Sequence, residues 1–245
     1  MKGIILAAGR GSRMKTLTDD RPKCLVELNG KPLLKWQVDA LHAAGIYEIA
    51  IITGYKRRLL ASLGLIEFHN SRWAETNMVS SLACASAWLE SDSCIVSYSD
   101  IFYKPSAVKC LLASSAPLAI TYDPNWLDLW RRRFKNPLVD AEVFKLNPHG
   151  GLAEIGRRAA SIADIEGQYM GLLRFTPKGW GEFARIRSMM SLKDCDAMDM
   201  TGGLQKVIDE GRIPIQAIPY EQNWGEVDSG SDLALYKEMY PDEMN

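Results

Sequence analysis

The chain begins with an apolar run of strand length, residues 2–7, that leads directly into a loop rich in glycine and positive charge. The glycines and cations of this loop are Gly9, Gly11, Arg10, Arg13, Arg21 and Lys23. Glycines let backbone N–H groups approach an anion closely, and arginine and lysine side chains neutralise it. A single glycine pair would be ordinary turn chemistry. A buried strand followed by two glycines and four cations predicts a polyphosphate site.

Two common phosphate motifs do not fit this loop. The P-loop requires a glycine, four residues and then Gly-Lys-Ser/Thr, whereas Gly11 is followed by Ser12 and Arg13. The dinucleotide fingerprint requires a third glycine three residues after the second, and Met14 stands there. The loop therefore belongs to a different class of phosphate site.

Strand and helix patterns alternate along the first half of the chain. We expect strands at residues 2–7, 48–53, 93–98 and 116–122, and helices at residues 31–44, 55–63, 78–89 and 104–114. This alternation predicts an α/β fold with parallel strands, right-handed crossovers and helices on both faces of the sheet. Gly9 and Asp100 each follow a strand, so we expect both on the rim where ligands of such sheets bind.

The second half is less regular. We expect a hairpin from residues 140–146 and 152–155, strands at 168–175 and 213–218, and helices at 177–187, 203–210 and 229–240. The sequence has no Pro/Ser-rich linker and no repeat. We therefore predict a single domain over residues 1–245, with a nucleotide-binding half at about 1–122 and an acceptor-binding half at about 123–245.

Composition excludes several other classes of protein. The net charge of −1 does not favour broad binding to nucleic acid or to an anionic membrane surface. No segment approaches the ~18 uninterrupted apolar residues of a membrane span. The five cysteines form no Cys-x-x-Cys pair, which favours reduced thiols and a cytoplasmic location. The oligomeric state stays open, and a homo-oligomer is compatible with the sequence.

The run Leu-Ala-Ala-Gly-x-Gly-Ser-Arg at residues 6–13, followed by Arg-Pro-Lys at 21–23, resembles the signature of nucleotidyltransferases that make nucleotide-activated sugars and small phosphorylated alcohols. The resemblance implies their fold, a Rossmann-like, mixed but mainly parallel sheet flanked by helices, as in nucleotide-diphospho-sugar transferases. It also implies that the loop wraps a triphosphate and that Arg13 and Lys23 act on the reacting phosphates. The matching positions are Leu6, Ala8, Gly9, Gly11, Ser12, Arg13 and Lys23.

Two aspartates are candidate ligands of Mg²⁺, which typically takes one or two carboxylates and completes its shell with phosphates and waters. Asp100 and Asp228 each end a short strand-like run, and the resemblance implies that one aspartate at each of these places holds the metal. Taken alone, either could instead cap a following helix. Glu226 is a weaker third candidate ligand, which we expect at the rim of the site.

Candidate base-binding groups come from resemblance alone. Asn77, Ser80 and Ser81 match a stretch that lines the base pocket of small cytidylyltransferases using phosphocholine and related acceptors. Gly54 and Tyr55 match a turn near the base in the same family. The resemblance favours CTP and leaves UTP open.

Candidate acceptor-binding groups include a basic run beside two tryptophans, Trp126 and Trp130. Its arginines are Arg131, Arg132 and Arg133. Guanidinium groups suit phosphate, phosphonate or carboxylate, and aromatic faces suit a quaternary ammonium. We expect these arginines to bind an acceptor more negatively charged than phosphocholine; the alternative is that the tryptophans are core and the arginines a solvated face. Gln168 and Tyr169 resemble a family strand that borders the acceptor.

We therefore expect a Mg²⁺-dependent cytidylyltransferase. A small phospho- or phosphono-acid would attack the α-phosphorus of CTP, giving a CMP-linked product and pyrophosphate. The resemblance is closest to cytidylyltransferases for phosphocholine, phosphonates and phosphorylated amino-acid amides. Two alternatives stay open: a sugar-1-phosphate nucleotidyltransferase using UTP or another triphosphate, and a non-catalytic nucleotide-binding regulatory subunit.

Overall fold

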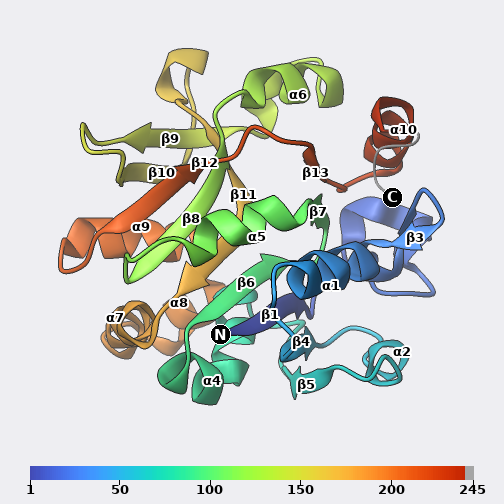
Figure 1. The fold of residues 1–245 in the computed structure, drawn as a ribbon, viewed down its shortest axis with the longest axis horizontal. Helices are drawn as coiled ribbons and strands as arrows, with labels where there is room; N and C mark the ends of the chain where they lie inside the picture. The colour runs from blue at the N-terminus through green and yellow to red at the C-terminus, as the bar shows by residue number, and fades with distance from the viewer. Residues whose placement is uncertain (241–245) are drawn as a thin grey trace.

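The computed structural model of the chain describes residues 1–240, which form a central seven-stranded sheet with helices packed around it (Figure 1). The strand order is β12-β8-β11-β6-β1-β4-β5. The strands are β1 (Lys2–Ala7), β4 (Ile49–Thr53), β5 (Ile66–His69), β6 (Cys94–Tyr98), β8 (Leu118–Asp123), β11 (Gln168–Phe175) and β12 (Ile215–Pro219). Every residue of β4 and β8 is buried, so both faces of the sheet are covered.

Three two-stranded sheets accompany the main one. They are β2 (Glu27–Leu28) with β3 (Lys31–Pro32), β7 (Ile101–Tyr103) with β13 (Trp224–Glu226), and β9 (Glu142–Leu146) with β10 (Leu152–Arg158). The helices are α1 (Leu33–Ala43), α2 (Arg58–Ala61), α3 (Met78–Leu82), α4 (Ser86–Ser91), α5 (Pro105–Leu112), α6 (Trp126–Arg133), α7 (Pro177–Ser188), α8 (Leu192–Ala197), α9 (Met200–Glu210) and α10 (Gly230–Met239).

The sheet is mixed but mainly parallel, which confirms the fold class predicted from the sequence. β1 is parallel to β4 and β6, and β12 is parallel to β8. β11 is antiparallel to both of its neighbours, β6 and β8. β11 comes from the second half of the chain and is inserted between strands of the first half, so the two halves share one sheet.

Several predicted elements have different bounds in the structure. The helix predicted at residues 78–89 is divided into α3 and α4 by a short turn at residues 83–85. At the start of α4, Ser86 Oγ donates a hydrogen bond to the Ala83 carbonyl at 2.8 Å. The helix predicted at 55–63 is reduced to the short α2. The hairpin predicted across residues 140–155 is confirmed as β9 and β10.

Strand register explains how distant segments reach one edge. Leu6 of β1 pairs with Tyr98 of β6 in parallel, so the loops that follow these two strands leave the sheet at the same edge. β13 then pairs with β7 with Glu226 opposite Ile101, and the Val227 amide donates to the Asp100 carbonyl at 2.9 Å. These pairings place residues 226–228 beside residues 100–101.

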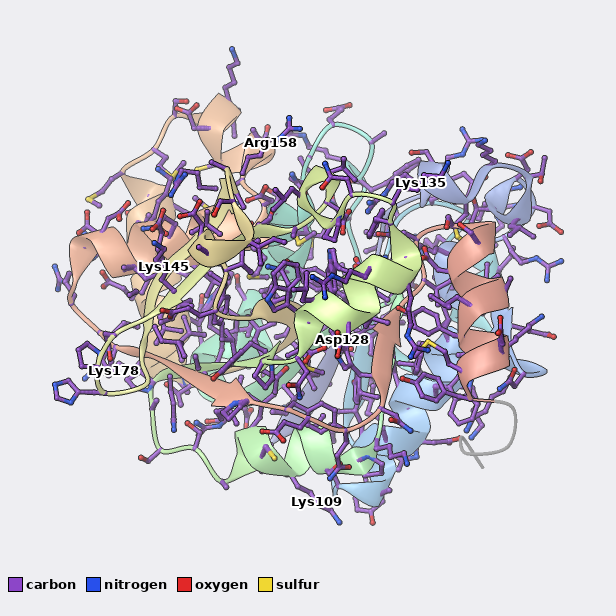
Figure 2. The ribbon with its side chains drawn as sticks, turned by 90° about the horizontal axis from the view of Figure 1, so that it is seen from above. Lys109, Asp128, Lys135, Lys145, Arg158 and Lys178 are labelled. Carbon is purple, nitrogen blue, oxygen red and sulfur yellow. The ribbon has the colours of Figure 1, made fainter. Side chains whose placement is uncertain are left out.

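The outer surface carries charges of both signs. Exposed charged residues such as Lys109, Asp128 and Lys178 lie around the outside of the molecule (Figure 2). Within residues 1–240, no helix combines the length and the apolar character needed to cross a membrane.

Candidate active site

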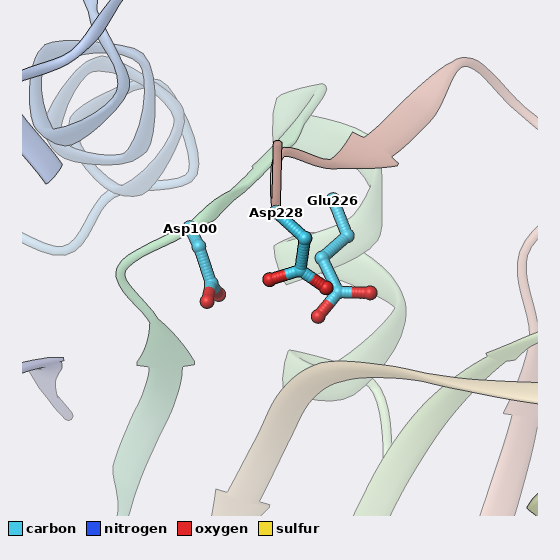
Figure 3. A group of neighbouring side chains, drawn as sticks. All are labelled: Asp100, Glu226 and Asp228. Carbon is cyan, nitrogen blue, oxygen red and sulfur yellow. The ribbon is translucent and has the colours of Figure 1, made fainter. Parts of the chain in front are cut away.

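Three carboxylates meet at the edge of the sheet (Figure 3). One oxygen from each of Asp100, Glu226 and Asp228 lies within 4.8 Å of the others. Asp100 lies in the turn between β6 and β7, and Asp228 lies between β13 and α10. Glu226, expected at the rim, is instead a member of the cluster, because the end of β13 carries it in beside Asp228.

Two cations from the N-terminal loop neutralise part of this charge. Lys23 Nζ donates to Asp100 Oδ2 at 2.7 Å and to Asp228 Oδ1 at 2.5 Å, and its side chain is only 7% exposed. Arg13 reaches the same Asp228 oxygen at 3.0 Å. The structure therefore brings Arg13, Lys23, Asp100 and Asp228 into one cluster of ion pairs.

Mutual interactions shift the proton affinities of these groups. Burial opposes the charged form of Lys23, but the carboxylates of Asp100 and Asp228 outweigh it and raise its pKa. Burial likewise opposes the charge on Asp228, and Lys23 lowers the pKa of that carboxyl. Burial, followed by the charges of Asp228 and Asp100, raises the pKa of Glu226 to about 8.

The cluster suits a divalent metal ion. Carboxylate oxygens are ligands that Mg²⁺ prefers, and three of them converge here. Asp100 Oδ1 is buried and, among residues 1–240, has no hydrogen-bond partner. Burial first, and then the charges of Asp228 and Asp100, disfavour the charged form of Glu226. A divalent cation would satisfy the unpaired Asp100 oxygen.

A cavity of about 330 Å³ opens beside the cluster. Of the residues selected from the sequence, those that line it are Leu6, Ala8, Gly9, Gly11, Ser12, Arg13, Lys23, Asn77, Ser81 and Asp100. Gly11 adopts a left-handed backbone with φ of 70°, and a Cβ there would lie 2.8 Å from the Lys23 Cβ. Glycine at this position thus lets the loop fold against Lys23.

The far end of this cavity has polar groups held in place by hydrogen bonds. The buried Asn70 amide donates to the hydroxyls of Thr76 and Ser81 at 2.9 Å each. Asn77 caps α3 and donates to the Ala197 carbonyl at 3.2 Å. Sequence reasoning missed other lining residues here, namely Trp73, Thr76, Met78, Tyr98 and Ser99, because the motif carried no signal for them.

Three of the expected base-binding residues lie outside this cavity. The Tyr55 amide donates to the Ala8 carbonyl at 2.9 Å, and its ring packs edge-on against Trp73. A Cβ on Gly54 would lie 2.5 Å from both the Ala8 carbonyl and the Trp73 side chain. Gly54 and Tyr55 thus support the lining from behind. Ser80 Oγ donates to the Cys195 carbonyl at 3.0 Å and joins α3 to α8.

A second cavity, of about 230 Å³, shares Arg13, Met78 and Tyr98 with the first. Gln168 and Tyr169, selected from the sequence, line it. So do further aromatic and acidic residues, including Trp130, Phe144, Asp140, Glu142 and Asp199. Burial and the neighbouring Asp199 raise the pKa of Glu142 to about 7. This cavity is therefore aromatic and acidic rather than basic.

The basic run does not line this cavity. Arg131 and Arg132 are exposed on α6, outside both cavities. The Arg133 side chain is fully buried, where it contacts Glu226, Asp228 and Asp232. Helical periodicity explains the difference, because Trp126, Trp130 and Arg133 follow i, i+4, i+7 spacing and share the inner face. None of the three arginines expected to bind the acceptor therefore lines either of these two cavities.

Comparison with known proteins agrees with this geometry. Residues 3–151 match the MobA-like NTP transferase domain. The CTP:phosphoglutamine cytidylyltransferase of Campylobacter jejuni is 37% identical over 96% of this chain and 98% of its own length. The 2-aminoethylphosphonate cytidylyltransferase of Lancefieldella rimae is 26% identical over 97% of this chain and 92% of its own.

Solved structures share the fold. The inositol-1-phosphate CTP transferase of T. maritima superposes with a TM-score of 0.75 at 22% identity, covering 97% of this chain and 94% of that one. The CTP:phosphocholine cytidylyltransferase of Streptococcus pneumoniae gives 0.69 at 22% identity, covering 97% and 98%. With its matched domain and its full-length relative, this chain is a nucleotidyltransferase that belongs to the MobA-like NTP transferase family.

Proposed function

We propose that the chain is a CTP-dependent cytidylyltransferase that transfers CMP to a small phosphorylated or phosphonate acceptor and releases pyrophosphate. One observation carries the proposal: the cationic N-terminal loop meets two acidic tips, 77 and 205 residues away from Lys23, where two adjoining cavities share Arg13. The two full-length relatives described above are cytidylyltransferases.

The first cavity is the proposed CTP site. The backbone around Gly9 and Gly11 would face the triphosphate, and Arg13 and Lys23 would neutralise charge that builds up on the phosphates during the reaction. Positioning and charge neutralisation supply most of the catalysis in transfers at phosphorus. Asn77, Ser81 and the neighbouring Thr76 offer the polar groups for the base.

Asp100 and Asp228, with Glu226 beside them, would hold Mg²⁺. A bound Mg²⁺ supplies positive charge to the phosphates and so makes pyrophosphate a better leaving group. Lys23 stays within reach of the same oxygens and keeps the two aspartates together.

The second cavity is the proposed acceptor site, and Arg13 lines both cavities. An acceptor oxygen would form the new bond to the α-phosphorus while the bond from that phosphorus to pyrophosphate breaks. The acceptor needs no general base, because a phosphate with a second pKa of about 6 is largely dianionic at neutral pH.

The chemistry of the acceptor cavity favours an acceptor with a cationic end. Trp130 and Tyr169 offer aromatic faces, and Glu142 and Asp199 offer carboxylates. This replaces the more anionic acceptor that the basic run had suggested. The Lancefieldella rimae relative is named for 2-aminoethylphosphonate, which carries an amino group. We also propose that the whole chain acts as one domain, since both halves contribute strands to the main sheet.

Pyrophosphate release tests the proposal directly. Each of the four nucleoside triphosphates would be combined with phosphocholine, 2-aminoethylphosphonate, a phosphorylated glutamine and glucose 1-phosphate. We expect turnover with CTP and an amino- or ammonium-bearing acceptor, and its loss in Asp228→Asn. Preference for UTP with glucose 1-phosphate would favour the sugar-phosphate alternative. Tight CTP binding without turnover on any acceptor would favour a regulatory subunit.

A further inference from the structure

Arg133 is a fully buried cation that lies behind the carboxylate cluster. It ends α6, and its side chain is 0% exposed. One guanidinium contacts three carboxylates: Glu226 at 3.3 Å, Asp228 at 3.6 Å and Asp232 at 3.1 Å. Its planar group also lies over the rings of Trp130 and Phe134, at 5.1 and 5.0 Å from their centroids. Such a confined guanidinium has little freedom to change its partners.

The contact with Asp232 extends the reach of Arg133 to the backbone of the site. Asp232 Oδ1 faces Arg133, while Asp232 Oδ2 accepts hydrogen bonds from the amides of Asp228 and Ser229 at 3.0 and 2.9 Å. Asp232 and Ser229 also form the capping box that starts α10. Arg133 therefore acts on Asp228 in two ways: by an ion pair with its carboxylate at 3.6 Å and, through Asp232, on its main chain.

The two oxygens of Asp228 face different cations. Oδ2 faces Arg133 at 3.6 Å, and Oδ1 faces Lys23 and Arg13 on the side of the cavities. Arg133 lines neither the nucleotide cavity nor the acceptor cavity. Arg133 thus compensates the negative charge of Glu226 and Asp228 from the side that faces away from the two cavities. The side of the cluster that faces the cavities stays open to ligands.

We propose that Arg133 is a positioning residue for the metal site: its guanidinium holds Glu226 and Asp228 beside Asp100, with free oxygens turned toward the acceptor cavity that both residues line. This inference rests on the proposed function, because it assumes that these carboxylates hold a divalent cation. Partners that orient metal ligands from behind commonly change metal affinity or activity by about 10–100-fold when removed.

Metal binding by the full-length chain tests the inference. Mn²⁺ binding would be measured by electron paramagnetic resonance without nucleotide, and the Mg²⁺ concentration for half-maximal pyrophosphate release would be measured at saturating CTP. We expect Arg133→Met to weaken metal binding about 10–100-fold. Arg133→Lys should be intermediate, because one ammonium lacks the fork that reaches all three carboxylates. Lys135→Met, at an exposed position just beyond α6, is the matched control.

A purely structural role would lower the folded fraction at every metal concentration, whereas a positioning role lets high Mg²⁺ restore kcat in Arg133→Lys. Folded variants that bind Mn²⁺ as tightly as the wild type would overturn the inference. If Arg133→Met does not fold, the result for Arg133→Lys decides. Two results would instead overturn the proposed metal site itself. One is that the wild-type chain does not bind Mn²⁺, and the other is that Asp228→Asn binds Mn²⁺ as tightly as the wild type.

Discussion

Lys23 is the residue on which the charges of the proposed nucleotide site converge. A lysine with only 7% of its side chain exposed requires ionic partners, because burial disfavours an unpaired charge. Asp100 and Asp228 supply them, and the pairing holds Lys23 in its charged form. The ammonium is therefore fixed beside the cavity before any phosphate arrives, as pre-organised electrostatic catalysis requires.

Lys23→Ala should lower kcat by about 10²–10³, the usual loss when one pre-organised stabilising group is removed. Steady-state pyrophosphate release measures it, normalised to the folded fraction from circular dichroism. Lys109→Ala, which removes an exposed lysine from α5, should behave as the wild type. Turnover near the wild-type rate in folded Lys23→Ala would contradict the role given to this residue.

Glu142 makes stability depend on pH. Burial and Asp199 raise its pKa to about 7 from an ordinary value of 4.5. Between these values the folded chain keeps a proton that the unfolded chain has released, so this group lowers the free energy of unfolding as pH rises. The contribution is complete below pH 4.5 and is lost by about pH 7.

Glu142→Gln should remove this dependence. The variant should gain stability over the wild type as pH rises from about 4.5 to 7, with a constant gain above that. Urea unfolding at pH 5, 6, 7 and 8 measures the difference, and Glu90→Gln at an exposed position of α4 is the control. A difference that is the same at all four pH values would show that Glu142 is not perturbed in this way.

At the scale of elements, the loop after β1 combines a left-handed turn with a close contact. Gly11 and Gly64 have nearly the same backbone, with φ of 70° and 72°. A Cβ on Gly11 would meet the Lys23 side chain at 2.8 Å, whereas one on Gly64 would meet no heavy atom of residues 1–240 within 4 Å. Comparing alanine substitutions at these two glycines therefore distinguishes the effect of backbone strain from the effect of displacing Lys23.

Gly64→Ala should lower the free energy of unfolding by about 1–2 kcal/mol and leave kcat unchanged, since it adds only the strain of a left-handed alanine. Gly11→Ala should cost at least as much stability and should also lower kcat, because its methyl group displaces Lys23. Chemical denaturation and pyrophosphate release measure the two effects. Equal kcat in both variants would mean that the contact between Gly11 and Lys23 is catalytically irrelevant.

Local sequence patterns predicted those elements whose signal is local. β1 and β11 have the expected bounds, because each is a strand-length apolar segment that ends at turn or helix-start residues. The loop rich in glycine and cations was also predictable from the sequence, because its characteristic residues lie close together, between residues 9 and 23. β5, β7 and α8 were missed, since each spans only three to six residues and depends on pairing or packing with distant segments.

The inner face of α6 shows why the burial of Arg133 beside the carboxylates could not be predicted from the sequence. Three consecutive arginines predict a solvated or ligand-binding surface, and Arg131 and Arg132 are indeed exposed. Arg133 is buried because Glu226, Asp228 and Asp232 surround it, and these lie 93 to 99 residues further along the chain. No local pattern encodes that match. The acidic and aromatic cavity proposed for the acceptor depends on the same kind of distant pairing.

At the scale of the molecule, the site joins three segments that lie far apart in the sequence. Lys23 precedes α1, Asp100 lies between β6 and β7, and Asp228 lies between β13 and α10. A ligand that contacts all three segments binds the folded chain and has no comparable site on the unfolded chain. Its binding free energy therefore adds to the free energy of unfolding of the whole chain.

CTP and Mg²⁺ together should raise the melting temperature well above the effect of either alone. At 100 times its dissociation constant a ligand stabilises the fold by about 2.7 kcal/mol. For a chain of this size that corresponds to about 5–10 °C. Thermal unfolding with CTP and Mg²⁺, with CTP and a chelator, and with GTP and Mg²⁺ measures the shift. Because the carboxylates of Asp100 and Asp228 lie beside the proposed triphosphate site, CTP without a divalent cation should bind weakly. An equal shift with the chelator present would mean that Lys23 and Arg13 alone balance the phosphates, and that the three carboxylates hold no metal during nucleotide binding.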